Sequence, residues 1–332
     1  MNSQGKMMIK HVFGPVPSRR LGQSLGIDPV PLKTCNWNCV YCQLGRTKPF
    51  TLERKNFIEK DEILSQVKEA LEAHRPGEID WVTFVGSGET ALHVALGEMI
   101  RAVKGMTDLP VAVITNGALL HLSEVREEVA AADAVLPSFD AGSAQLYRKI
   151  NRPPRELTFE NLVEGLIAFR NKFIGQLWLE VMMIQGMNDS DQALKEIAFW
   201  LEKIKPDEVH ILQPTRPPVE EWVKPLDDEG LMRVQAILGE VATLVLPATG
   251  SFDFSGEGNL IDAIVGIITR HPMKESELIE ALAQWSPGDV RQTLKDLKES
   301  GKAQTVTRYG TQFWNASEVI YPNKRRDKND RE

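Results

Sequence analysis

The sequence predicts an α/β fold made of repeated βα units, followed by a smaller module of helices and a hairpin. Short β-type runs alternate with longer amphipathic segments between residues 24 and 241, as repeated βα units do. Nearly all polar and glycine-rich motifs directly follow an expected strand, where barrel-like α/β folds build their active face. Six units suit a partial barrel rather than a complete one, and periodicity alone leaves an open doubly wound sheet as an alternative.

Each expected element rests on its own pattern of apolar residues. The helix expected at Lys60–His74, for example, places Ile63, Val67 and Leu71 on one stripe. The expected strands are Ser24–Asp28, Ile79–Val85, Pro110–Thr115, Ala134–Ser138, Gln176–Ile184 and Glu208–Leu212. The expected helices are Lys60–His74, Ala91–Val103, His121–Ala131, Leu157–Lys172, Ser190–Ile204 and Asp227–Val241.

The composition divides the chain into four parts. Residues 1–245 form the βα core with an N-terminal extension, and 246–257 read as a linker because they are rich in Pro, Gly, Ser and Thr. Residues 258–319 form a second domain, and the charged tail 320–332 is expected to be disordered.

The second domain resembles a winged-helix module, with three helices and a β-wing. Its first helix carries Leu260, Ile264 and Ile268 on one face, and Pro287 starts its third helix. Residues 258–318 hold seven Lys/Arg and eight Asp/Glu, whereas a helix that reads nucleic acid usually carries a basic excess. We therefore favour a protein-contact or substrate-presenting role over DNA binding. Because all chemical motifs lie before residue 220, we expect the module to be dispensable for them.

The overall composition is that of an ordinary globular protein, with 332 residues, 42% hydrophobic and 26% charged. Its net charge of −7 provides no global basic field to attract nucleic acid. No signal peptide or bilayer-spanning apolar stretch is recognisable, so we expect a cytoplasmic protein without membrane contact.

The three cysteines, Cys35, Cys39 and Cys42, are the most informative residues of the chain. They form a C-x3-C-x2-C motif within eight residues, and their odd number leaves one over in any disulfide scheme. Three soft ligands on one loop suit an iron–sulfur cluster with one iron left open for a ligand. The alternative is a zinc knuckle, but His11 and His74 are both too distant to complete one.

With Tyr41 before the last cysteine, this loop resembles the cluster loop of the radical S-adenosylmethionine (SAM) superfamily. The resemblance implies a partial (βα)6 TIM-like barrel and a [4Fe–4S] cluster that cleaves SAM reductively. The resulting 5′-deoxyadenosyl radical would abstract hydrogen from an unidentified substrate, which could be a small molecule, an RNA or a protein. A reducing donor such as ferredoxin or flavodoxin would supply the electron.

The resemblance also implies a set of SAM contacts, although it designates no catalytic residue. Considered alone, Glu89 and Asp140 could instead cap helices, and Asn116-Gly117 is foremost a turn pair. The implied SAM-binding residues are Gly86, Ser87, Gly88, Glu89, Asn116, Ser138, Asp140 and Gln213.

Three further stretches, Gly14–Gly22, Asn151–Pro153 and Thr215–Pro218, are similar to the wyosine-synthetase-like iron–sulfur oxidoreductases. Wyosine synthases carry further cysteines before the cluster loop, and this chain has none before Cys35, so the tRNA-modifying function stays an alternative. A second alternative is an iron–sulfur sensor that uses its winged helix, and a third is a glycyl-radical activator. Arginines in and near these stretches could meet an anionic substrate or form surface ion pairs; they are Arg19, Arg20, Arg152 and Arg216.

Overall fold

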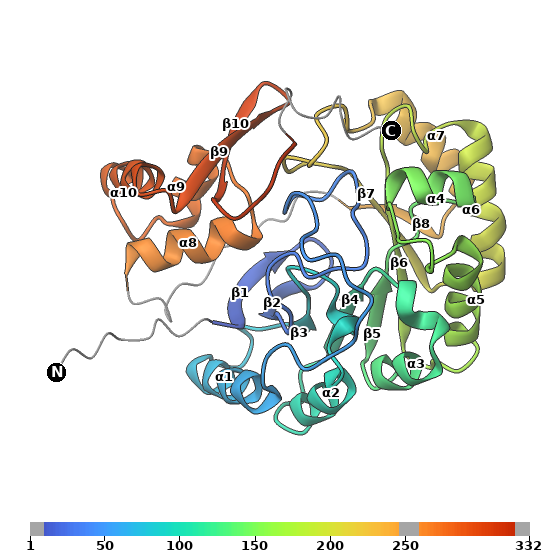
Figure 1. Cartoon of the computed structure of the whole chain (residues 1–332). Coiled ribbons are helices and arrows are strands. Elements are labelled where there is room, and N and C mark those ends of the chain that lie inside the picture. The colour runs from blue at the N-terminus through green and yellow to red at the C-terminus, as the bar shows by residue number, and fades with distance from the viewer. Residues whose placement is uncertain (1–9, 246–258, 323–332) are drawn as a thin grey trace.

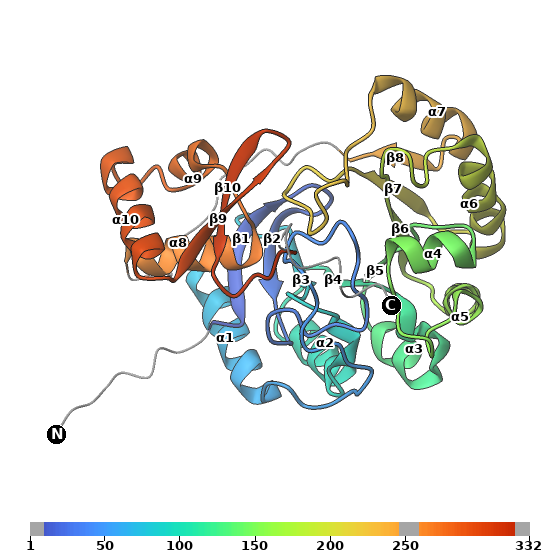
Figure 2. The ribbon, with the colours of Figure 1, turned by 45° about the horizontal axis from the view of Figure 1, so that its top comes forward.

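Eight strands form one curved sheet in chain order in the computed structural model, which describes residues 10–245 and 259–322. The first strand pairs antiparallel with the second, and all later neighbours are parallel. The two edge strands lie at opposite ends of the open sheet (Figure 2). The predicted α/β class and partial barrel are therefore confirmed. The strands are β1 Val12–Ser18, β2 Gly22–Ile27, β3 Trp81–Phe84, β4 Val111–Thr115, β5 Ala134–Pro137, β6 Gln176–Met182, β7 Glu208–Leu212 and β8 Ala242–Leu244.

Helices cover the outer, convex face of this sheet (Figure 1). In α6, Leu194, Ile197 and Leu201 repeat at helical spacing and are buried against the sheet, and the Ser190 hydroxyl caps the first turn. The helices of this part are α1 Lys60–Ala73, η1 Thr90–Leu92, α2 Leu96–Lys104, η2 Ala118–His121, α3 Ser123–Val129, α4 Ala144–Ile150, α5 Phe159–Arg170, α6 Asp191–Ile204 and α7 Asp228–Leu238.

Alternation along the strands separates the outer core from the barrel interior. In β4, Val111 and Val113 belong to the large core under the helices, whereas Ala112 and Ile114 belong to a smaller inner cluster. The inner cluster therefore lies on the face of the sheet opposite the helices.

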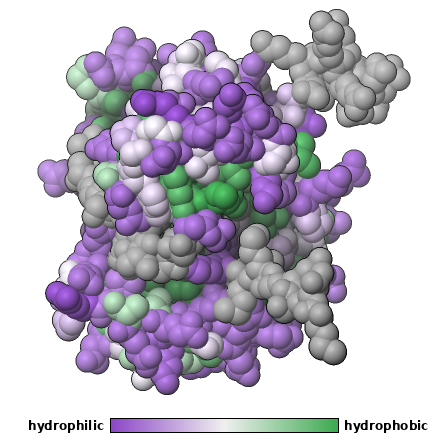
Figure 3. Space-filling model, turned by 90° about the vertical axis from the view of Figure 1, so that its left-hand side faces the viewer, coloured by the Kyte–Doolittle hydropathy of each residue, from purple (hydrophilic) through white to green (hydrophobic). Residues whose placement is uncertain are grey.

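The C-terminal module, residues 259–322, has a hydrophobic core of its own, which includes Ile264, Leu294 and Trp314. Its elements match the expected order of three helices and a hairpin, and Met273 forms an isolated bridge with Trp314. Its winged-helix identity stays a prediction. The left-hand side of the molecule in Figure 1 faces the viewer in Figure 3. This surface is mostly hydrophilic, with apolar side chains gathered near the centre of the view. The elements are α8 Leu260–Arg270, α9 Glu275–Ala281, α10 Pro287–Glu299, β9 Ala303–Arg308 and β10 Thr311–Ala316.

The module lies against β1 and the loop after β7 (Figures 1 and 2). Arg308 donates to the carbonyls of Pro218 and Val219 at 3.0 and 3.1 Å. The start of the expected disordered tail differs from the sequence prediction, because the Tyr321 hydroxyl donates to the Gln43 carbonyl at 3.0 Å. The expected linker, 246–257, and the tail from residue 323 lie outside the described residues.

Within the described residues, no helix is long and apolar enough to span a bilayer.

Candidate functional site

The three cysteines lie in the cysteine loop, residues 29–59, which leads from the C-terminal end of β2 to α1. All three are free and half-buried. Burial raises the pKa of the Cys35 thiol to about 12. Burial also raises the pKa of Cys39 well above its usual value, and the charges of Asp140, Cys35 and Cys42 add to this rise. Burial therefore opposes ionisation of Cys35 and Cys39, and a bound metal would offset the cost of their negative charge.

A side-chain donor approaches each cysteine sulfur. Donors of this kind stabilise thiolate ligands and tune the reduction potential of an iron–sulfur cluster. The Lys33 ammonium is buried, which opposes its charge, but Cys42 and Cys35 outweigh this and raise its pKa. The three contacts are Lys33 Nζ to Cys42 Sγ at 3.1 Å, Asn116 Nδ2 to Cys35 Sγ at 3.8 Å and Asn151 Nδ2 to Cys39 Sγ at 3.7 Å.

A single metal ion and a cluster require different arrangements of the cysteines. Across residues 10–245 and 259–322, no three His, Cys, Asp or Glu side chains are placed to hold one metal ion. The cysteines of a zinc knuckle converge on one ion at about 2.3 Å each. Cysteines of a [4Fe–4S] cluster each bind a different iron.

Asp140, three residues beyond β5, is buried and forms hydrogen bonds with two residues of the cysteine site. Its Oδ2 accepts from Tyr41 Oη and Asn151 Nδ2, both at 2.6 Å, and its Oδ1 accepts from the Met182 amide at 2.8 Å. Burial raises the pKa of Asp140 to about 6. Because these contacts use both carboxylate oxygens, Asp140 is placed to orient Tyr41 and Asn151. Tyr41 directly precedes Cys42 in the chain, and Asn151 donates a hydrogen bond to the Cys39 sulfur.

The glycine-rich element after β3 packs directly on the cysteine loop. A Cβ on Gly88 would lie 1.8 Å from the Thr34 carbonyl oxygen, and one on Gly86 would lie 2.9 Å from the Gly88 oxygen. The Glu89 amide donates to the same Thr34 oxygen at 2.9 Å. Glycine is therefore required here because two backbone segments touch.

Ser87, within this element, ties the loop to the end of β2. Its hydroxyl and amide donate to the two Asp28 carboxylate oxygens at 2.5 and 3.0 Å, and its carbonyl accepts from the Lys33 amide at 2.7 Å. Arg270 of α8 approaches Asp28 at 3.5 Å. The glycine-rich element, which is predicted to contact SAM, thus also holds the residues before Cys35 in place through hydrogen bonds.

Glu89 is buried and caps η1, as its alternative interpretation expected. Oε1 accepts from the Ala91 amide at 2.9 Å and the Thr115 hydroxyl at 2.5 Å, and Oε2 accepts from the Asn116 amide at 2.7 Å. Burial raises the pKa of this carboxyl. The Asn116 side chain, held in this way, donates to Asn36 Oδ1 at 2.5 Å and reaches a cysteine sulfur.

Two of the predicted SAM residues carry unused polar atoms. Among the described residues, the half-buried Ser138 hydroxyl has no hydrogen-bond partner, and its strand phase matches that of Leu136, which belongs to the inner cluster. Gln213, after β7, has a buried Oε1 without a partner in the same part of the chain. A bound polar ligand would satisfy such atoms.

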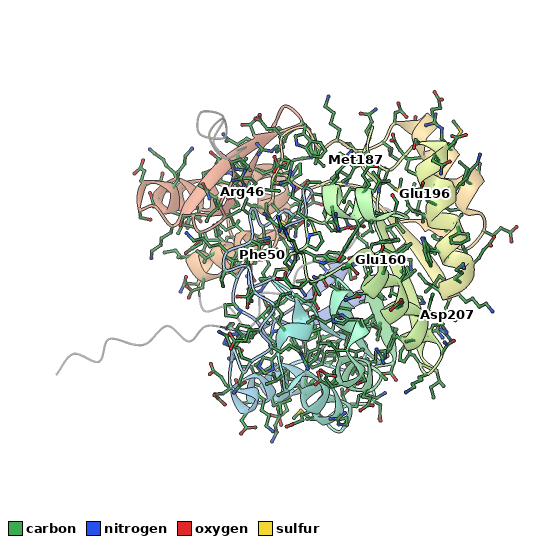
Figure 4. The ribbon with its side chains drawn as sticks, turned by 45° about the vertical axis from the view of Figure 1, so that its right-hand side comes forward. Arg46, Phe50, Glu160, Met187, Glu196 and Asp207 are labelled. Carbon is green, nitrogen blue, oxygen red and sulfur yellow. The ribbon has the colours of Figure 1, made fainter. Side chains whose placement is uncertain are left out.

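The cysteine loop contacts the C-terminal module through Arg46 and the loop after β6 through Tyr41. Figure 4 shows Arg46 where the cysteine loop meets the C-terminal module, with Phe50 below it and Met187 on the loop after β6. Met187 packs with Tyr41 against a small apolar cluster. Phe50 is exposed.

The four arginines singled out in the sequence divide into two pairs. Among the described residues, Arg19 donates a hydrogen bond to a hydroxyl and Arg216 donates one to a carbonyl oxygen. The other two form the ion pairs Arg20–Glu180 at 2.7 Å and Arg152–Glu220 at 2.5 Å.

Sequence reasoning missed several residues that support the site. Lys33 is signalled by its place two residues before Cys35, and Asp28 by its place at a strand end. Asn151 was noticed only as part of a motif. Arg270 comes from the distant C-terminal module, so only the tertiary structure reveals its contact.

Comparisons with known proteins point to one family. The model of the Radical SAM superfamily matches residues 30–201. The UPF0026 protein of Methanocaldococcus jannaschii is 35% identical over 274 residues, 81% of this chain and 85% of that protein. A protein named GTPase Obg from Brachyspira hyodysenteriae is 38% identical over 91% of this chain, which spans 44% of that longer protein. Native anSMEcpe with bound AdoMet shares the fold at a TM-score of 0.50 and 16% identity, over 65% of this chain and 58% of that one.

Proposed function

Since this chain belongs to the radical SAM superfamily, we propose that it binds a [4Fe–4S] cluster through Cys35, Cys39 and Cys42 and abstracts hydrogen from a substrate. Enzymes of this family use such a cluster together with SAM. When bound, the pair supplies one-electron cleavage of SAM and a 5′-deoxyadenosyl radical.

The observation that carries this proposal is the donor-supported set of three thiols on one loop. Lys33, Asn116 and Asn151 each donate to a different sulfur. Their amide and ammonium groups would stabilise the negative charge of cluster sulfurs and hold the loop in one conformation.

The remaining predicted residues take different roles in this proposal. Ser138 and Gln213, whose polar atoms are unused, would contact SAM directly. Asp140 and Glu89 would act as positioning residues through Asn151 and Asn116. Gly86, Ser87 and Gly88 would bring their backbone beside SAM while they brace the cysteine loop.

Anaerobic reconstitution with iron and sulfide tests the proposal. We expect about four irons per chain, cluster absorption and 5′-deoxyadenosine on addition of SAM and a reductant. A chain with Ser in place of all three cysteines is the matched control. Zinc in place of iron, or a cluster that yields no 5′-deoxyadenosine, would contradict the proposal, and the latter result would favour a sensor.

The proposal also includes an electron donor, a cellular compartment and an alternative substrate. A low-potential donor such as ferredoxin or flavodoxin would supply the electron, and a reducing cytoplasm would protect the cluster. For a wyosine-like alternative, a transfer RNA would be the substrate. It predicts SAM cleavage that accelerates on addition of tRNA.

A further inference from the structure

Three arginines and a neutral histidine lie where the barrel meets the C-terminal module. Arg19 comes from the turn between β1 and β2, Arg216 from the loop after β7, and Arg270 and His271 from the end of α8. After burial, the positive charge of Arg19 is the largest cause that lowers the pKa of Arg216, to about 10. Segments far apart in sequence thus bring these charges within electrostatic reach of one another.

Only some of these charges have an acidic partner. Arg270 lies 3.5 Å from the buried Asp28 carboxylate. In residues 10–245 and 259–322, Arg19 and Arg216 form no ion pair: Arg19 donates to the Thr215 hydroxyl at 2.6 Å and Arg216 to the Pro272 carbonyl at 2.8 Å. Glu180 raises the pKa of Arg19 and Glu277 raises that of Arg216, but burial and a neighbouring arginine outweigh them and lower both values. This is unfavourable for the two charges until an anion binds.

The same place holds unused hydrogen-bond donors. A guanidinium has five N–H donors, and the described structure gives Arg19 and Arg216 one side-chain hydrogen bond each. His271 Nε2 is buried without a partner in the described part of the chain. Arginine forks of this kind match the planar oxygens of carboxylate and phosphate.

This place is connected to the cysteine site. Gln43, the residue after Cys42, donates from Nε2 to the Arg270 carbonyl at 2.9 Å. The Arg270 guanidinium lies 3.5 Å from Asp28, whose carboxylate also accepts a hydrogen bond from Ser87. Arg270, which precedes His271, therefore joins this group of side chains to the cysteine loop.

A small anion fits this place better than a polyanion. The chain has a net charge of −7, and most basic groups of the C-terminal module are balanced by acidic ones, so no extended basic surface leads to the site. We propose that Arg19 and Arg216 form a subsite for one carboxylate or phosphate group of a small-molecule substrate, closed on one side by His271. This inference rests on the proposed function and specifies the substrate class of the same site.

Direct titration tests the subsite without SAM or reductant. Inorganic phosphate and acetate are titrated separately, at fixed ionic strength, into the anaerobically reconstituted full chain by calorimetry. The variants are Arg19→Gln and Arg216→Gln, and the matched control is Arg101→Gln, an exposed arginine on α2. We expect saturable binding of at least one ion to the wild type and the control. Each site variant should bind at least tenfold more weakly, which corresponds to about 1.4 kcal/mol.

Melting temperatures without ligand separate a binding role from a structural one. Removal of one repelling charge should leave the melting temperature of Arg19→Gln and Arg216→Gln unchanged or raised, whereas a purely structural role would lower it. The tighter-bound ion identifies the group as phosphate or carboxylate.

The inference would be overturned if neither ion bound saturably, or if the wild type and the variants bound the ions equally well. It would also be overturned if the wild type bound oligouridylate, if phosphate displaced that RNA, and if both variants lost the binding. The last would assign the site to RNA. A chain that binds phosphate yet forms no 5′-deoxyadenosine would contradict only the proposed function. A chain that cleaves SAM but binds neither ion would contradict only the subsite.

Discussion

At the scale of single residues, His271 shows how the boundary between barrel and module is built. Its ring contacts Phe13 at 6.3 Å between centroids, and its Nε2 is buried. Burial, followed by the charges of Arg216, Arg270 and Arg19, lowers the pKa of His271 to about 3. The histidine is thus held neutral at every pH at which the protein is expected to work.

This neutral histidine predicts acid sensitivity. In the unfolded chain His271 takes up a proton below its ordinary pKa of 6.5, whereas in the folded chain it does so only near pH 3. Stability is therefore lost as the pH falls through this window. At pH 5 the loss is about 2 kcal/mol at most, and less if water reaches the half-buried ring.

Urea unfolding at pH 7.5 and 5.0 would measure this effect. His271→Gln cannot titrate, so its free energy of unfolding should fall less than that of the wild type over the same interval. Equal losses in both proteins would mean that His271 accepts a proton freely in the folded state.

The two buried carboxylates illustrate what the sequence could not reveal. Glu89 and Asp140 were expected to contact SAM, since each follows a strand end. In the structure, the oxygens of each carboxylate accept three hydrogen bonds from the protein. Strand-end position predicts which rim a side chain belongs to, but the partner it finds there depends on loops that come from other parts of the chain.

At the scale of elements, the central strands were predictable and the edges were not. β2 to β7 match six expected strands to within a few residues, because buried parallel strands read as apolar runs. β1 was missed since Pro15 and Pro17 argue against a strand, although proline is tolerated at a sheet edge. β8 has three residues and α4 has seven, which is too short for a clear period.

The contact between the glycine-rich element and the cysteine loop predicts the effect of Gly88→Ala. The new Cβ would meet the Thr34 oxygen at 1.8 Å, so one of two backbone segments must move. We expect a loss of about 1–3 kcal/mol or more in unfolding free energy. Iron content after reconstitution should fall as well, because Cys35 follows Thr34 directly.

Gly266→Ala in α8 is the matched control for this substitution. No heavy atom lies within 4 Å of its added Cβ, so alanine should be neutral or stabilise the helix by about 1 kcal/mol. Full iron content and unchanged stability in Gly88→Ala would show that the loop adapts without cost.

At the scale of the whole molecule, the C-terminal module is joined to the site more closely than its sequence suggested. Because all the chemical motifs lie before residue 220, the sequence predicts that the chemistry survives removal of the module. The Arg46 amide, however, donates to the Ile320 carbonyl at 2.8 Å, and a Cβ on Gly45 would lie 2.4 Å from the same oxygen. The module therefore contacts the segment that follows Cys42.

Arg308 is the residue through which this coupling can be tested. It is buried, donates to two carbonyls of the loop after β7 and lies over the Tyr321 ring at 5.3 Å. Arg308→Met keeps the apolar stem but leaves both carbonyls without their donor, at a cost of roughly 1–3 kcal/mol for each. The substitution should therefore weaken the contact between the module and the barrel and leave the two hydrophobic cores unchanged.

We therefore expect Arg308→Met to separate unfolding of the module from unfolding of the barrel. Calorimetry should show one transition in the wild type and two in the variant, and the variant should lose iron faster on dilution. Arg291→Met is the control, because Arg291 is exposed and pairs with Glu275 inside the module. If the variant keeps a single transition and its iron, the module is a passive neighbour. Two transitions with faster iron loss would instead make it part of the structure that holds the cluster loop, since the contact of Tyr321 with Gln43 depends on where the module sits.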